Sequence, residues 1–233
     1  MPLTELAIGP GTWLLLVTCG AVCGVDAVSW PQLMLSRPLV AGTLGGTLLG
    51  DPAAGFMCGA ILELLALAHP PYGAATYPDT GPAGVVAGAG YAAAGGSGLA
   101  ALVVALLAGW AIGWLGARSV HLLRRINEGL LKPVEALAGE PARLERRHRT
   151  AIALDALRAG LITGGFALPT AIATRLAAGS SLAPTAVAAT AALLVVAVSG
   201  SAGSGARTLS ASLHAWHLLL LGAAVAWVVG RAY

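Results

Sequence analysis

The chain has 233 residues, of which 57% are hydrophobic and 10% are charged, and its mean hydropathy is +0.81. This composition excludes an ordinary soluble domain. The formal net charge at pH 7 is +3. Several stretches are long enough to cross a hydrocarbon layer of about 30 Å, which needs about 20 apolar residues. Because these stretches are continuous rather than short and alternating, the sequence predicts an all-α, polytopic integral membrane protein.

The first predicted helix covers residues 11–25, and the apolar stretch after it is interrupted at short intervals. The interrupting residues are Asp26, Pro31, Arg37, Pro38 and Asp51. The piece at 38–50 is therefore too short for a straightforward crossing, and it is typical of a re-entrant hairpin or a half-helix. A further helix is expected at 52–68, and it carries Glu63 inside an apolar run.

The next elements follow a turn at Pro70 and Pro71. Residues 81–98 are very rich in Gly and Ala, which permits either close approach of helices or a second non-helical excursion. The clearest helix is expected at 99–117. After a basic segment, we expect helices at 151–178, 183–199 and 213–230.

The basic segment contains eight of the 13 Lys and Arg residues, between Arg118 and Arg149. The positive-inside rule places it in the cytoplasm. The chain then divides into a membrane region with broken helices at 1–117, a basic connector at 118–150 and C-terminal membrane helices at 151–233. Interleaved glutamates and the lack of aromatic residues disfavour nucleic-acid binding. The connector is interpreted as solvated or facing lipid headgroups, with docking of a soluble partner as the alternative.

The interrupted part of the chain, residues 26–81, is where the sequence places the candidate binding site. Unpaired backbone groups in lipid cost several kcal/mol each, so broken helices persist only inside protein or around a wet cavity. A charge at the membrane centre costs about 2.5 to 3.5 kcal/mol, so ionisable groups kept there face a cavity or one another. Six such residues occur here: Asp26, Arg37, Asp51, Glu63, His69 and Asp79.

Four motifs occur in one order in this region. They are Arg-Pro-Leu-Val at 37–40, Leu-Gly-Asp at 49–51, Gly-x-x-Leu-Glu at 59–63, and Gly-Ala at 73–74 followed by Pro78 and Asp79. In sequence and spacing they resemble the membrane-embedded IIC subunit of the mannose/sorbose family of the bacterial phosphoenolpyruvate-dependent sugar phosphotransferase system (PTS). The resemblance covers about residues 24–84, and the rest matches only in hydrophobicity and in the position of the basic connector.

The resemblance implies a multi-pass sugar translocator of the bacterial cytoplasmic (inner) membrane. It would work with a IID membrane subunit and with cytoplasmic IIA and IIB phosphocarriers, in a larger complex that is expected to be trimeric. IIC would bind and pass the sugar and IIB would phosphorylate it on the inner side, so no catalytic residue and no cofactor is expected on this chain.

Carboxylates are the favoured sugar ligands, because each accepts hydrogen bonds from hydroxyls and such bonds count for more in a low-dielectric cavity. Glu63 and Asp79 are therefore the main candidates for binding a hexose. The full candidate set is Glu63, Asp79, Gln32, His69, Asp26 and Arg37.

The motifs depart from the family pattern at one place, which leaves the substrate open. Many members carry Asn-Ile-Gly-Ala where this chain has Pro-Tyr-Gly-Ala at 71–74. His69 or Tyr72 either replaces the missing amide or makes a structural hydrogen bond at a helix end. Gln32 either projects into the cavity or satisfies the turn after Pro31.

Structural roles compete with ligand roles at the remaining candidates. Arg37 either anchors a helix end by snorkelling or pairs with a cavity carboxylate. Asp51, between Gly50 and Pro52, is interpreted as a helix N-cap or turn residue. Glu63 has the alternative of bonding a neighbouring helix, and Asp79 that of forming a turn.

Residues outside 26–81 receive structural interpretations. Cys19, Cys23 and Cys58 lie in apolar segments without a CxxC pair, so we expect small core residues and no metal site. Asp155 and Arg158 are three residues apart and either form an internal ion pair or lie at the cytoplasmic membrane edge, which we favour.

Two other function classes compete with sugar transport by a PTS. Gly-Gly-Ser-Gly at 95–98 matches the Gly-x-Ser-Gly pattern of rhomboid-type intramembrane serine proteases, in which Ser97 would act with His214 or His217. The Ala-His-x-x-Gly segment usual for such proteases is absent from this sequence. The other alternative is a facilitator or regulatory membrane subunit that is not coupled to phosphorylation.

Overall fold

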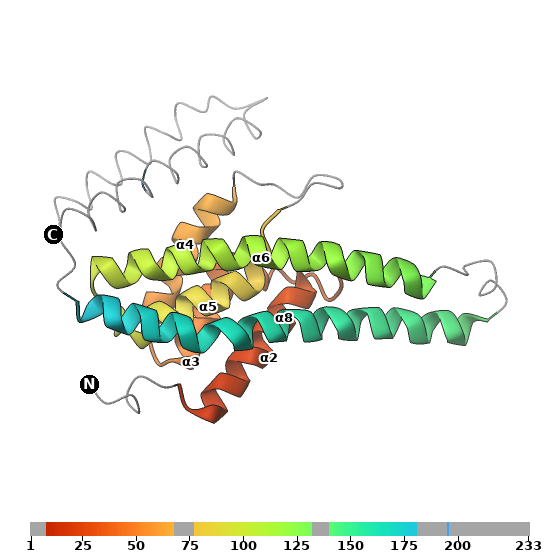
Figure 1. Cartoon of the computed structure of the whole chain (residues 1–233), viewed down its shortest axis with the longest axis horizontal. Coiled ribbons are helices and arrows are strands. Elements are labelled where there is room, and N and C mark those ends of the chain that lie inside the picture. The colour runs from red at the N-terminus through yellow and green to blue at the C-terminus, as the bar shows by residue number, and fades with distance from the viewer. Residues whose placement is uncertain (1–7, 68–76, 132–139, 181–194, 196–233) are drawn as a thin grey trace, which may run out of the picture.

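The computed structural model describes residues 8–67, 77–131, 140–180 and 195, and every regular element in these ranges is an α-helix. The prediction of an all-α fold is confirmed. The expected helices at 183–199 and 213–230 lie outside the described residues, apart from Val195. Figure 1 shows the helices α2 (Pro10–Asp26), α3 (Pro38–Leu48), α4 (Pro52–Ala66), α5 (Thr80–Ala93), α6 (Leu99–Leu131) and α8 (Pro141–Ala178).

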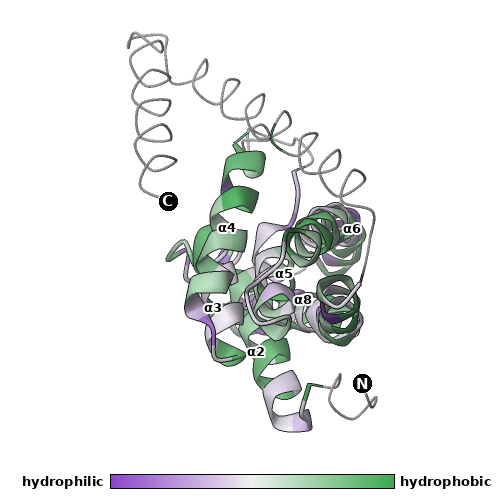
Figure 2. Cartoon of the chain, turned by 90° about the vertical axis from the view of Figure 1, so that its left-hand side faces the viewer, coloured by the Kyte–Doolittle hydropathy of each residue, from purple (hydrophilic) through white to green (hydrophobic). Residues whose placement is uncertain are grey.

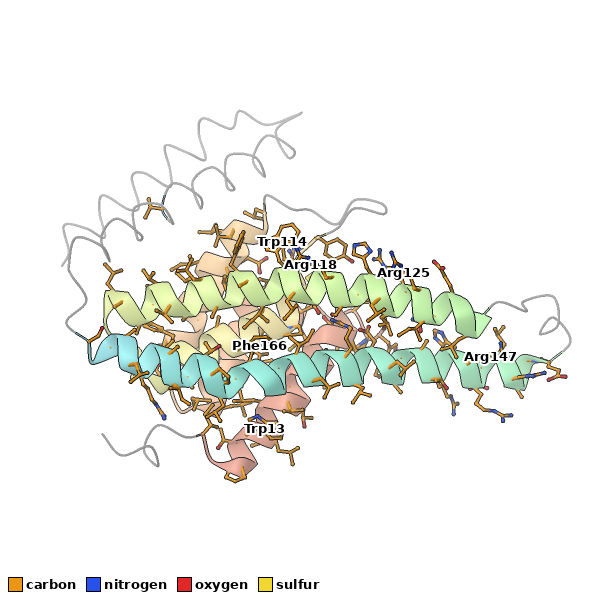
Figure 3. All side chains as sticks on the ribbon, in the orientation of Figure 1. Trp13, Trp114, Arg118, Arg125, Arg147 and Phe166 are labelled. Carbon is orange, nitrogen blue, oxygen red and sulfur yellow. The ribbon has the colours of Figure 1, made fainter. Side chains whose placement is uncertain are left out.

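Helices α6 and α8 run side by side and antiparallel, and they extend beyond the shorter helices at one end (Figure 1). Both are long and apolar enough to cross a membrane. Both helices extend into the predicted connector, α6 as far as Leu131 and α8 from Pro141 onward. The Arg, Leu and Glu residues of the connector are good helix formers, which explains these extensions. Figure 3 shows Arg125 and Arg147 on these extensions, and Arg147 donates a hydrogen bond to the Leu130 carbonyl.

Helices α3 and α4 form a hairpin. The α3 N-terminus and the C-terminal part of α4 lie together and form its open end. Each begins with a proline, and Gly50 (φ +85°) provides the turn between them. Asp51 caps α4 by accepting a hydrogen bond from the Ala54 N–H (2.9 Å), which confirms its predicted N-cap role. With 11 and 15 residues, the helices are about 16 and 22 Å long, so each is shorter than the hydrocarbon layer.

Glycines allow α3 to contact α4 on one side and α5 on the other. A Cβ on Gly42 would lie 2.8 Å from both the Gly55 carbonyl oxygen and the Gly59 Cα. A Cβ on Gly88 of α5 would lie 2.8 Å from the Gly42 Cα and still closer to its carbonyl oxygen. The Gly- and Ala-rich segment after residue 80 is therefore a closely packed helix, as the first of the two sequence alternatives proposed.

Helix α5 lies at the centre of the bundle, between α3, α4, α6 and α8 (Figure 2). Every residue from Gly81 to Ala92 is buried. The α5 C-terminus is attached to α8 by Thr174, whose hydroxyl donates to the Gly90 carbonyl (2.6 Å). Helix α2 crosses α8, and the Trp13 indole N–H donates to the Gly164 carbonyl (2.9 Å).

The variant Gly88→Ala tests the glycine packing, because its methyl group must push α3 and α5 apart. Overpacking costs about 1 to 3 kcal/mol, and each kcal/mol shifts the melting temperature by about 2 to 4 °C in a chain of this size. We expect the apparent melting temperature of the detergent-solubilised variant to fall by about 3 °C or more. In the control Gly165→Ala on α8, the Cβ would meet nothing within 4 Å, so no loss is expected. Equal melting temperatures for the two variants would contradict the close approach.

Candidate functional site

Asp79 lies immediately before α5 and is held between two long helices. Its backbone N–H donates to the Gly113 carbonyl of α6 (2.9 Å). Its side chain packs where α6 has no side chain of its own, because a Cβ on Gly116 would lie 2.5 Å from the Asp79 Cβ. The Asp79 side chain is only 3% exposed, so its carboxylate needs a partner inside the protein.

Arg158 of α8 is that partner. Its Nη1 donates to Asp79 Oδ2 (2.6 Å) and to the Ser119 hydroxyl of α6 (3.0 Å). Its Nε donates to Asp155 Oδ1 (3.0 Å), one turn earlier on α8. Arg158 is therefore shared by two carboxylates, and its side chain is 10% exposed. Of the two sequence alternatives for Asp155 and Arg158, the structure shows the internal ion pair.

The network continues from Asp155 into the segment between α2 and α3. The Ser29 hydroxyl donates to Asp155 Oδ2 (2.8 Å). Asp26, at the end of α2, accepts hydrogen bonds from the backbone N–H groups of Leu33 (2.6 Å) and Ser36 (3.0 Å). These bonds give buried Asp26 a structural role in ordering residues 27–37.

A small pocket borders this network, at the level where α5 begins. Its cavity volume is about 30 Å³, which is enough for water but smaller than a hexose. The wall contains both apolar and polar groups from α2, α6, α8 and the segment before α5. The polar and charged residues that line it are Tyr77, Asp79, Thr80, His121, Arg124 and Arg158.

Glu63 makes a second, more exposed ion pair at the open end of the α3–α4 hairpin. Its Oε1 lies 3.1 Å from Arg37 Nη1, with the side chains 20% and 54% exposed respectively. Its Oε2 also accepts a hydrogen bond from the Leu39 N–H (3.4 Å), which holds the α3 N-terminus against α4. Arg37 thus pairs with a carboxylate, but Glu63 does not line the pocket, so the predicted pairing with a cavity carboxylate is met only in part.

The candidate ligand residues are distributed over several places. Asp79 borders the pocket, whereas Glu63, Asp26 and Arg37 are engaged in contacts outside its lining. Gln32 is exposed on the segment before α3, where its backbone has a positive φ of 60°. His69 lies outside the described residues, and so do His214 and His217 of the protease hypothesis.

Arg158 is the functional candidate that sequence reasoning did not place at the site. It is separated from Asp79 by 79 positions, so no local motif connects the two residues. The available signal was the presence of an arginine within the apolar part of α8, because such a residue needs a buried partner.

The geometry shows an all-helical bundle with two helices long and apolar enough to cross a membrane, a hairpin of two short helices and a charged pocket beside α5. The chain belongs to the family described as PTS system sorbose-specific IIC component, whose model matches residues 11–157. It is 34% identical over 149 residues to the fructose permease IIC component of Bacillus subtilis (strain 168), and 35% identical over 81 residues to the PTS system sorbose-specific EIIC component of Lacticaseibacillus casei.

These two alignments cover 62% and 35% of this chain. The chain spans about half the length of the first relative (53%) and 29% of the second. Family membership thus rests on the matched part of the chain. It favours a transport subunit over the intramembrane protease, and it supports the membrane location of the chain.

Two solved structures share the fold. One, described as the structure of a membrane protein, is 18% identical, has a TM-score of 0.63 and aligns with 96% of each chain. The other is the mannose transporter ManYZ in complex with microcin E492. It is 22% identical, has a TM-score of 0.54, and the alignment covers 94% of this chain and 87% of that chain.

The variants Arg158→Met and Arg37→Met separate the two ion pairs by stability. Loss of Arg158 leaves two buried carboxylates without a cation, and breaking a buried pair costs about 3 to 5 kcal/mol. Loss of Arg37 affects a partly exposed pair, which is worth about 0 to 1 kcal/mol. Thermal unfolding of the purified variants should therefore show a much larger shift for Arg158→Met. Similar shifts for both would contradict the buried network.

Proposed function

We propose that the chain is the sugar-translocating IIC subunit of a phosphoenolpyruvate-dependent PTS. It binds a hexose-type sugar in a membrane cavity, and transport is coupled to phosphorylation of the sugar by IIB. The observation that carries this proposal is the family match over residues 11–157, which contains the hairpin, all of α5 and both main candidate carboxylates.

Asp79 is the proposed principal sugar ligand, because it is the candidate carboxylate that borders the pocket. A hydroxyl can donate to a carboxylate and accept from a guanidinium, so a sugar can enter between Asp79 and Arg158. The pocket has to widen for this, since about 30 Å³ does not hold a pyranose ring. A pocket of this size is compatible with a carrier whose site widens on binding.

Glu63 is the second proposed ligand, and its partial exposure is compatible with contact to a solute at the open end of the hairpin. Gln32 and His69 remain candidates in the same proposal. Asp26 and Arg37 support the site by holding residues 27–39 in place, through the bonds to Leu33 and Ser36 and the pair with Glu63.

The proposed assembly contains a IID membrane subunit in the same complex and IIA and IIB phosphocarriers on the cytoplasmic side, with a trimer as the expected arrangement. The proposed location is the bacterial inner membrane, which the chain crosses several times. The family match supports these partners, and the charged ends of α6 and α8 suit a cytoplasmic position by the positive-inside rule.

Sugar binding by the variants Asp79→Asn and Glu63→Gln tests the proposed ligands. Each substitution keeps the shape of the side chain but removes a charged acceptor. We expect the affinity for the best-bound sugar to fall at least tenfold, about 1.4 kcal/mol. The measurement is binding of a panel of hexoses and amino sugars to purified protein, with and without a IID subunit.

Matched controls are Glu145→Gln, in an exposed ion pair on α8, and Ser97→Ala, in the exposed α5–α6 connection. Both should bind sugar like the wild type. Wild-type affinity in both Asp79→Asn and Glu63→Gln would refute the ligand assignment. Sugar binding without a dependence of uptake on IIB would instead favour the uncoupled facilitator.

A further inference from the structure

The buried network around Arg158 contains one cation and two carboxylates. Asp79 and Asp155 are 3% and 2% exposed, so neither charge is solvated by bulk water. Two acids compete for one guanidinium, which distributes its donors between them through Nη1 and Nε. The positive charge of Arg158 therefore does not depend on one carboxylate alone for its compensation.

The two carboxylates differ in the elements that carry them. Asp155 and Arg158 are three residues apart on α8, so they stay together in any rigid movement of that helix. Asp79 precedes α5 and reaches Arg158 from a different element. A separation of the α5 N-terminus from the two long helices would therefore remove Asp79 from Arg158 and leave Asp155 in place.

Two hydroxyl groups support the different roles of Asp155 and Asp79 in this network. Ser29 donates to Asp155 Oδ2, whereas Arg158 contacts Oδ1 of the same carboxylate. Ser119 of α6 accepts from Arg158 Nη1, beside the bond to Asp79. Nη2 lies 2.9 Å from Asp155 Oδ1 but is not aligned for a hydrogen bond, and among the described residues it has no hydrogen-bond partner. If Asp79 leaves, Arg158 thus keeps its Nε–H hydrogen bond to Asp155 and has an additional N–H donor at Nη2.

We propose that Asp155 is a positioning residue that makes Asp79 exchangeable between Arg158 and a ligand hydroxyl. A buried cation left without any carboxylate is strongly unfavourable, and Asp155 removes that obstacle to opening. The pocket then opens by separation of the α5 N-terminus from both α6 and α8, with Arg158 still neutralised. The ligand part of this inference rests on the proposed function, whereas the opening itself does not.

Hydrogen exchange of the Asp79 amide measures this opening directly, because that N–H is bonded to Gly113 of α6. We compare the wild-type full chain with Asp155→Asn and Asp79→Asn in lipid nanodiscs, using overlapping peptides around residue 79. In Asp155→Asn, Arg158 depends on Asp79 alone, so exchange should slow about fivefold or more. In Asp79→Asn the pair is lost, and exchange at position 79 should accelerate.

The direction of the Asp155→Asn effect distinguishes the two roles of the residue. Loss of a merely structural contact loosens the site and speeds exchange, so faster exchange would overturn the proposal. Failure of Asp155→Asn to fold, with Asp79→Asn folded, would overturn it as well. The charge-retaining Asp155→Glu and the exposed-pair control Glu145→Gln should exchange like the wild type.

Sugar binding provides the second readout on the same proteins. Because Asp155→Asn favours the closed pocket, its affinity for the sugar should fall about fivefold or more relative to the wild type. Slow exchange in Asp155→Asn without sugar binding by the wild type would retain the opening mechanism and reject the proposed function. Sugar binding with wild-type affinity and unchanged exchange in Asp155→Asn would reject the mechanism and retain the function.

Discussion

The close contact of α3 with both α4 and α5 is the constraint on which the remaining structure depends. Lipid tails are as apolar as leucine side chains, so association of helices in a membrane relies on close packing and polar contacts. Gly42 and Gly88 allow backbone-to-backbone contact and thereby give the short helix α5 a fully buried position. This position brings Asp79, at the start of α5, between the two long helices.

The buried charges follow from that placement. An arginine in the apolar part of α8 requires a carboxylate, and α5 delivers Asp79 to it from a distant part of the sequence. Asp155 supplies a second carboxylate from α8 itself, and Ser29 connects it to the segment ordered by Asp26. The closely packed helix α5 and the buried charges thus come together at Asp79, which also lines the small pocket.

The sequence was sufficient to predict the features that depend on local chemistry. Proline and glycine positions predicted the short helices, and Asp51 was recognisable as an N-cap because capping involves residues three positions apart. The choice of partner for Asp79 was not predictable, since it depends on which faces of α5 and α8 meet. The helical extensions at 118–131 and 141–150 were missed because hydropathy detects the membrane boundary, whereas helix propensity continues beyond it.

The small size of the pocket beside Asp79 limits what a solute carrier with this fold can bind without opening. A permanently wide polar cavity would admit ions and large solutes, whereas a cavity of about 30 Å³ beside an ion pair has room only for water. A ligand can then open the site only by binding the open state more tightly than the closed one. Charge balance decides how much of the binding energy this opening consumes. An arginine with a single partner would resist separation, and an arginine with a second carboxylate on its own helix can exchange the first for a hydroxyl.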